Sequence, residues 1–184
     1  MMRKKALIVL AEGFEEIEAI TTIDILRRGG IEVTIASLKE KHVKGSRNIE
    51  VVADTTIDKI ALDYDAIILP GGMPGAENLF ASKEVCSLII EMNNKKKIIA
   101  AICATPAIVL APLGILDNKT ATCYPSMETN FNIRTTYKED AVVIDGNIIT
   151  SRGPATAMEF AFTLVKVLAG ERLANSIKSA VLAS

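Results

Sequence analysis

Histidine and cysteine are scarce in this sequence, which has one histidine, His42, and three cysteines among 184 residues. Because zinc is usually held by these two residue types, we predict no metal site. The cysteines are odd in number and are not spaced as in a disulfide framework, and no signal peptide precedes the first apolar segment. We therefore expect a cytoplasmic protein. His42 lies in the polar stretch 39–44 (KEKHVK) and is expected at the surface.

Long apolar runs and an excess of one charge are also missing. Runs such as residues 6–11 and 66–69 are much shorter than the ~20 residues needed to span a bilayer. The formal net charge is −1 and the basic clusters are short, so the chain has no positive electrostatic field that would attract DNA or RNA. We therefore predict no membrane segment and no nucleic acid as a dedicated partner.

What the sequence does contain is an alternation of apolar strands and amphipathic helices. Its length and composition, 49% hydrophobic and 23% charged, predict a single domain over residues 1–184. Such alternation predicts an α/β fold, with a mostly parallel sheet and helices on both faces. Strands are expected at residues 5–11, 31–36, 65–69, 98–102, 120–123, 141–144 and 148–150, a hairpin or edge strand at 48–53, and helices at 15–28, 83–93, 154–168 and 172–182.

Residues 97–107 (KIIAAICATPA) place a cysteine between a strand and a helix. Thr105 suits the N-cap of that helix and Pro106 its first position. Because a helix N-terminus favours negative charge, we expect the pKa of the Cys103 thiol to lie below its usual ~8.5. Cys103 would then be a nucleophile. The alternative is a small buried apolar residue, and this stretch alone does not separate the two.

Gly71 and Gly72 follow the apolar segment 66–69. Residues 71–75 (GGMPG) match neither the dinucleotide pattern nor a P-loop, which argues against a phosphate cradle. Adjacent glycines after a strand can turn their N–H groups toward a neighbouring strand end and form an oxyanion hole. The alternative is a tight turn, which the glycines alone favour.

Glu15, Glu16 and Glu18 open the predicted helix 15–28, where the helix dipole favours carboxylates. The dipole is enough to explain Glu15 and Glu16. Glu18 has a position that could face the sheet edge. Beside a Cys103 thiolate its carboxyl should keep its proton, donate to the sulfur and act as acid and base. The alternative is that Glu18 only stabilises the helix through the positive end of its dipole, and the sequence alone slightly favours this alternative.

Four motifs together resemble a known family. They are residues 11–18 (AEGFEEIE), 69–72 (LPGG), 100–104 (AAICA) and 150–154 (TSRGP). Over essentially the whole chain they are similar to the ThiJ/PfpI superfamily, and within it to the DJ-one branch. The resemblance implies a flavodoxin-like three-layer sandwich, a homodimer, no cofactor, an oxidisable Cys103, a protonated Glu18, and oxyanion donors from Gly71, Gly72 and Ala104.

Two positions depart from the patterns of the superfamily. Ala104 stands where the protease-like branch has histidine, which argues against a peptidase. Tyr124 stands where several animal members have histidine before a proline, so a general base is missing or replaced. A tyrosine, with a pKa of ~10, donates a hydrogen bond but is a poor base at neutral pH.

Two functions in oxidative and carbonyl stress defence fit these residues. In the first, favoured here, Cys103 attacks methylglyoxal or its early adducts and Glu18 moves the proton, as in a cofactor-independent glyoxalase or deglycase. In the second, the protein is a redox sensor or chaperone whose Cys103 is oxidised to a sulfinate. Helical burial explains Cys86, while Cys123 either packs or resolves oxidised Cys103.

The helix expected at residues 15–28 is also predicted to form part of a homodimer interface. It is apolar on more than one face, and such a helix usually buries a second face. Charges of both signs could set the register of a two-fold interface, with Glu15 or Asp24 of one copy pairing with Arg28 or Arg47 of the other. A monomer with solvated charges is the alternative.

Overall fold

The computed structural model describes residues 3–61 and 63–183. Its strands are β1 (Lys5–Leu10), β2 (Glu32–Ser37), β3 (His42–Lys44), β4 (Glu50–Val52), β5 (Thr55–Thr56), β6 (Ala66–Leu69), β7 (Ile98–Ile102), β8 (Thr120–Ala121), β9 (Thr136–Tyr137), β10 (Val142–Asp145) and β11 (Ile148–Ser151). Its α-helices are α1 (Glu16–Arg28), α2 (Gly75–Ala81), α3 (Lys83–Asn94), α4 (Ala157–Ala169) and α5 (Glu171–Ala180). A π-helical segment, η2, spans Pro106–Leu110, and short 3₁₀ turns span Ile57–Lys59, Glu128–Asn130 and Pro154–Thr156.

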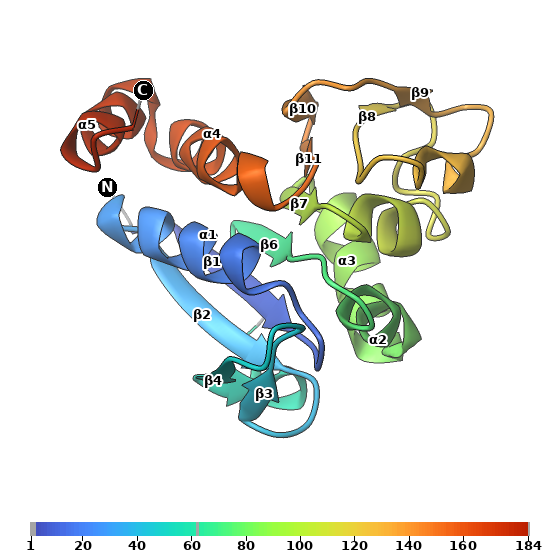
Figure 1. Ribbon diagram of the computed structural model, residues 1–184, viewed down its shortest axis with the longest axis horizontal. Coiled ribbons are helices and arrows are strands. Elements are labelled where there is room, and N and C mark those ends of the chain that lie inside the picture. The colour runs from blue at the N-terminus through green and yellow to red at the C-terminus, as the bar shows by residue number, and fades with distance from the viewer. Residues whose placement is uncertain (1–2, 62, 184) are drawn as a thin grey trace.

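Seven strands form the central sheet, in the order β10-β11-β7-β6-β1-β2-β5 (Figure 1). All neighbours pair in parallel except β10, which is antiparallel to β11. From β2 to β11 the order is that of flavodoxin-like folds, in which ligands bind at the carboxyl ends of the strands. The register aligns those ends, because Leu69 pairs with Ala101 and Ser151 pairs with Ile102.

Helices cover both faces of the sheet (Figure 1). Helix α1 packs against α4, and α4 against α5, on one face, while α2, α3 and η2 pack together on the other. Strand β1 alternates between the two layers: Ile8 and Leu10 join the core under α1 and α4, and Leu7 and Val9 join the core under α3. The predicted three-layer α/β sandwich is confirmed.

The segment after Cys103 differs from the predicted helix. Thr105 and Pro106 take the predicted N-cap and first positions, but Thr105 already has helical backbone angles and its side chain makes no cap hydrogen bond. Its hydroxyl lies 2.8 Å from the Leu69 carbonyl and 2.9 Å from the Ile102 carbonyl, which ties β6 to β7. Beyond η2, Pro112 lacks an N–H and Gly114 has φ +69°, so the chain continues in turns rather than as an α-helix.

Two smaller elements differ from the prediction, and a third agrees with it. Helix α2 was not predicted, because it is short and begins among glycines and a proline. The strand expected at residues 120–123 ends at Ala121 and pairs only with β9. The hairpin expected near residues 48–53 forms from β3 and β4. Within the described part of the chain, no helix is long and apolar enough to cross a membrane.

Candidate functional site

Cys103 occupies a sharp turn at the carboxyl end of β7. Its φ of +68° lies in the left-handed region, which costs a residue other than glycine ~1–3 kcal/mol. Its N–H donates to the Ser151 carbonyl at 2.9 Å, and its carbonyl accepts the Tyr124 N–H at 2.8 Å. These two bonds hold the turn in place and leave the cysteine 8% exposed at the edge of the sheet.

Backbone donors and a carboxyl group surround the Cys103 sulfur. The N–H groups of Gly72 and Ala104 hydrogen-bond to it and lower its pKa. Burial, followed by the neighbouring Glu18 carboxylate, raises the pKa of the thiol well above its usual value. The predicted low thiol pKa is therefore wrong for the free protein, because desolvation and the neighbouring carboxylate outweigh the backbone donors.

Glu18 is a fully buried carboxyl on the first turn of α1. Its Oε2 accepts the Gly71 N–H at 2.7 Å, while its buried Oε1 completes no hydrogen bond among the described residues. Burial raises the pKa of Glu18 to about 7; the Glu15 charge adds to the rise, and Cys103 and Gly71 oppose it. The expected placement beside Cys103 is observed, and the two groups titrate as a pair that loses its first proton near neutral pH.

The glycine pair after β6 has two different tasks. A Cβ on Gly71 would lie 2.6 Å from the Cys103 Cβ and 2.9 Å from Glu18 Oε2, so only glycine fits there. The Gly71 N–H is bonded to Glu18 and is not free for an oxyanion. Of the three predicted oxyanion donors, Gly72, at φ +90°, and Ala104 have N–H groups directed at the Cys103 sulfur, and their role as oxyanion donors stays a prediction.

Glu15 is the N-cap of α1. Its Oε2 accepts the Glu18 N–H at 2.8 Å, and its own N–H donates to the Gly71 carbonyl at 2.9 Å. The side chain is therefore used within the chain and is only 9% exposed. Its predicted pairing with a charge across a dimer interface stays a prediction.

Glu16 binds a loop that sequence reasoning did not connect to it. Its Oε1 accepts the N–H groups of Arg47 at 2.6 Å and Ile49 at 3.4 Å, and its Oε2 accepts the Ser46 hydroxyl at 3.3 Å. Burial raises its pKa, but these hydrogen bonds together outweigh burial and lower it. The helix dipole alone is thus too weak an explanation for Glu16, and no local signal could have found partners thirty residues away.

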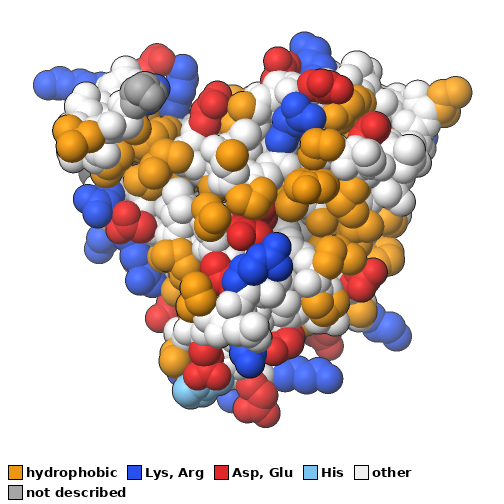
Figure 2. All heavy atoms as spheres, viewed as in Figure 1, with side chains coloured by type: hydrophobic (Ala, Val, Ile, Leu, Met, Phe, Trp, Pro, Cys, Tyr) orange, Lys and Arg blue, Asp and Glu red, His pale blue; other side chains and the backbone are white. Residues whose placement is uncertain are grey.

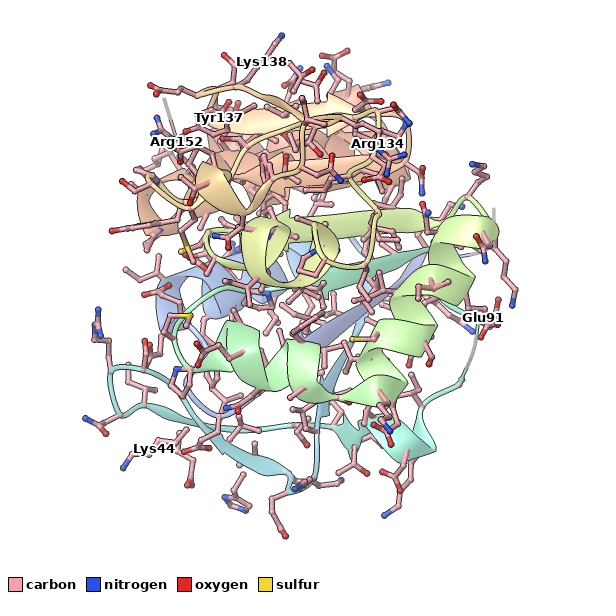
Figure 3. All side chains as sticks on the ribbon, turned by 90° about the vertical axis from the view of Figure 1, so that its right-hand side faces the viewer. Lys44, Glu91, Arg134, Tyr137, Lys138 and Arg152 are labelled. Carbon is pink, nitrogen blue, oxygen red and sulfur yellow. The ribbon has the colours of Figure 1, made fainter. Side chains whose placement is uncertain are left out.

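Cys123 and Tyr124 lie next to the Cys103 turn. Tyr124 is half-exposed, and a Cβ on Gly153 would lie 3.4 Å from its ring. Cys123 is fully buried; burial and the Glu128 charge raise the pKa of its thiol to about 12, and Arg152 opposes the rise. Figure 3 shows Arg152 close to Tyr137, on the same side of the molecule, and the Arg152 charge acts on Tyr137 as well.

The remaining candidates lie away from this site. His42 is exposed and pairs with Glu50 at 3.0 Å, so its predicted surface position is confirmed. Cys86 is half-buried on α3, and its thiol donates to the Phe80 carbonyl at 3.2 Å. In residues 3–61 and 63–183, His, Cys, Asp and Glu side chains form no group of three or more that could hold a metal ion.

The fold and this turn define a class of protein: a flavodoxin-like sandwich with a buried cysteine in a left-handed turn at the carboxyl end of a central strand. The chain belongs to the DJ-1/PfpI family, whose sequence model matches residues 4–167. Protein dj-1beta of Drosophila melanogaster is 41% identical over 98% of each chain. The glutathione-independent glyoxalase DJR-1.2 of Caenorhabditis elegans is 36% identical over 95% of this chain and 94% of its own. The solved structure of oxidized Toxoplasma gondii DJ-1 superimposes with a TM-score of 0.95, at 38% identity over 98% of this chain and 99% of its own.

Proposed function

We propose that this protein is a cofactor-independent glyoxalase of carbonyl stress defence, with Cys103 as nucleophile and Glu18 as acid and base. The observation that carries the proposal is the buried Glu18 carboxyl beside Cys103, with a pKa raised to about 7. A general base is most effective when its pKa lies near the working pH. The relative from C. elegans that is named a glutathione-independent glyoxalase supports the reaction class.

The first step is the addition of Cys103 to the aldehyde carbon of methylglyoxal. As the sulfur–carbon bond forms, the Glu18 carboxylate accepts the thiol proton, so no free thiolate is needed beforehand. The carbonyl electron pair moves to oxygen, and the N–H groups of Gly72 and Ala104 donate to that oxygen. Protonation of the oxyanion by Glu18 gives the hemithioacetal.

The second step moves hydrogen from one substrate carbon to the next. Glu18 removes the proton from the former aldehyde carbon and returns one to the adjacent carbon, while the hydroxyl proton of the hemithioacetal passes to the neighbouring ketone oxygen, so the first carbon is oxidised to a thioester and the second is reduced to an alcohol. Water then hydrolyses the thioester, which releases lactate and restores the Cys103 thiol. No external oxidant or reductant is required, and glyoxal would give glycolate by the same steps. Attack on an early adduct of an amine would release that amine, as in a deglycase.

Cys103→Ser and Glu18→Leu test this chemistry, with Cys86→Ser as the matched control. Lactate formed from methylglyoxal is measured by NMR, with chelator present and no amine buffer. We expect both site variants to lose turnover and Cys86→Ser to keep it. Turnover that survives in Cys103→Ser would contradict the nucleophile.

A second candidate is a redox sensor or chaperone, which the oxidized state of the Toxoplasma gondii relative favours. Two equivalents of peroxide would convert the Cys103 thiol to a sulfinate and release two waters. Protonated Glu18 and the N–H groups of Gly72 and Ala104 would then donate to the sulfinate oxygens. Wild-type protein that forms the sulfinate but no lactate would favour this function over the first.

We also propose that the protein is a cytoplasmic homodimer that uses the outer face of α1. Ile17 and Ile20 on α1, and Ile49 and Val52 on the neighbouring hairpin, are exposed. Figure 2 shows apolar side chains between charged ones on the face in front of α1. Apolar surface ringed by charge suits a two-fold interface. Arg28 and Asp24 pair within the chain at 2.8 Å, so a partner would extend that pair.

A further inference from the structure

The first turn of α1 lies between two loops. On one side, the Glu15 N–H donates to the Gly71 carbonyl at 2.9 Å, and Glu18 accepts the Gly71 N–H at 2.7 Å. On the other side, the Ser46 N–H donates to the Phe14 carbonyl at 2.8 Å. A displacement of this turn would therefore move both the Glu18 carboxyl and the β3–β4 hairpin.

Glu16 fastens the tip of that hairpin, residues 45–49, to the turn. Its carboxylate is 5% exposed and accepts the N–H groups of Arg47 and Ile49 at 2.6 and 3.4 Å. A Cβ on Gly45 would lie 2.3 Å from Glu16 Oε1, so the tip approaches the carboxylate more closely than a side chain would allow. A buried carboxylate that accepts backbone N–H groups makes stronger hydrogen bonds than a neutral acceptor.

We propose that Glu16 is a positioning residue for the Cys103 site: by holding the hairpin tip on the first turn of α1, it keeps the Glu18 carboxyl on the Gly71 N–H. Glu16 and Glu18 are two residues apart and reach opposite loops, which places one on each side of the same turn. The proposal rests on the proposed function for its turnover measurement alone. The position of Glu18 governs the Cys103 thiol whether or not a dicarbonyl is the substrate.

The test uses Glu16→Gln, which keeps the shape of the side chain and removes its charge. Hydrogen exchange at the Arg47 and Ile49 amides should become about tenfold faster, since hydrogen bonds to a charged acceptor are weakened. In alkylation by iodoacetamide, the pH profile of the Cys103 rate should move to lower pH, because a looser turn admits water to Glu18 and weakens the effect of its charge on the thiol. With methylglyoxal, kcat should fall while KM stays unchanged.

A second variant and a matched control make the test specific. In Gly45→Ala, the added Cβ clashes with the Glu16 carboxylate from the hairpin side. This variant should shift the pH profile of Cys103 alkylation in the same direction. Glu12→Gln is the control, because exposed Glu12 accepts the Lys44 N–H at 3.0 Å on the same hairpin but does not contact Glu16's partners in the tip. It should speed exchange at Lys44 and leave the Cys103 profile unchanged.

Faster exchange at the tip with an unchanged Cys103 profile, in both Glu16→Gln and Gly45→Ala, would overturn the proposal and leave Glu16 as a purely structural residue. If the Cys103 profile shifts in the two variants but wild-type protein forms no lactate, the positioning role is supported and the glyoxalase is contradicted. The two proposals therefore fail separately.

Discussion

Cys103 and Cys123 are two buried thiols on neighbouring segments, and they differ in what surrounds the sulfur. Cys103 lies in a left-handed turn, with backbone donors from Gly72 and Ala104 and the buried Glu18 carboxyl beside it. Cys123 follows a short strand, is fully buried, and is acted on by Glu128 and Arg152.

Burial raises the pKa of both thiols, so burial does not distinguish a reactive cysteine from an inert one. What distinguishes Cys103 is a carboxyl next to the sulfur with a pKa of about 7, together with the backbone N–H groups of Gly72 and Ala104, which the proposed mechanism uses as proton acceptor and oxyanion donors. In the proposed mechanism, reactivity follows from the pair of Cys103 and Glu18 rather than from the acidity of the thiol alone.

The largest expected effect comes from exchanging each thiol for a hydroxyl. Cys103→Ser should lower methylglyoxal turnover by about a thousandfold, because the nucleophile is removed. Cys123→Ser should keep turnover within about threefold of wild type, because that thiol has no part in the proposed reaction. Peroxide should likewise add oxygen to Cys103 first, as read by peptide mass spectrometry. Equal losses in the two serine variants, or Cys123 oxidised first, would remove the distinction.

A methyl group at the glycines beside each segment should sharpen the comparison. Gly71→Ala forces a Cβ to within 2.6 Å of the Cys103 Cβ, and overpacking of this kind typically costs ~1–3 kcal/mol. Gly153→Ala meets the Tyr124 ring at 3.4 Å and should cost less. Urea unfolding measures the loss of unfolding free energy in each variant. We expect lactate formation to fall steeply in Gly71→Ala and little in Gly153→Ala, and the reverse order would contradict the assigned geometry.

The raised pKa of Glu18 makes stability depend on pH. The folded-state value of about 7 exceeds the ordinary 4.5, so the folded protein holds this proton more tightly than the unfolded chain. The contribution is complete below pH ~4.5 and is lost as pH rises through ~7. The free energy of unfolding of wild type, compared with Glu18→Gln, should fall across this window. Glu128→Gln serves as the control, and parallel curves for wild type and Glu18→Gln would contradict the buried carboxyl.

The smallest effect is expected at the proposed dimer interface. Reversal of charge in Arg28→Glu with Arg47→Glu breaks the exposed Arg28–Asp24 pair, and such surface pairs contribute ~0–1 kcal/mol. Monomer stability should therefore change little, while sedimentation at micromolar concentration should show weaker self-association. A wild-type monomer of 19.8 kDa would contradict the dimer, and an unaffected dimer in the double variant would contradict these contacts.

The sequence carried the layer architecture and the approximate place of the site, since apolar strands that alternate with helices bring residues 69–72 and 103 to one edge of a parallel sheet. It did not carry the details that depend on distant backbone groups. The Gly71 N–H is bonded to Glu18, Thr105 ties β6 to β7, and Glu16 binds the hairpin tip. Each of these contacts joins segments at least thirty residues apart.

The direction of the shift in the Cys103 pKa was also beyond local reasoning. A helix N-terminus predicts a lower thiol pKa, whereas the folded chain buries Cys103 and places a carboxylate beside it. The net shift of the Cys103 pKa is therefore upward rather than downward, because desolvation is larger than the effect of a helix terminus.

The most direct test of the account is the pH dependence of Cys103 alkylation in wild type, Glu18→Gln and Glu128→Gln, followed by peptide mass spectrometry. We predict that the apparent pKa of Cys103 falls in Glu18→Gln, because the carboxylate that raises it is gone, and is unchanged in Glu128→Gln. Methylglyoxal turnover should nevertheless fall in Glu18→Gln, because the base is lost. An apparent pKa of Cys103 that stays the same or rises in Glu18→Gln would contradict the coupling of these two groups.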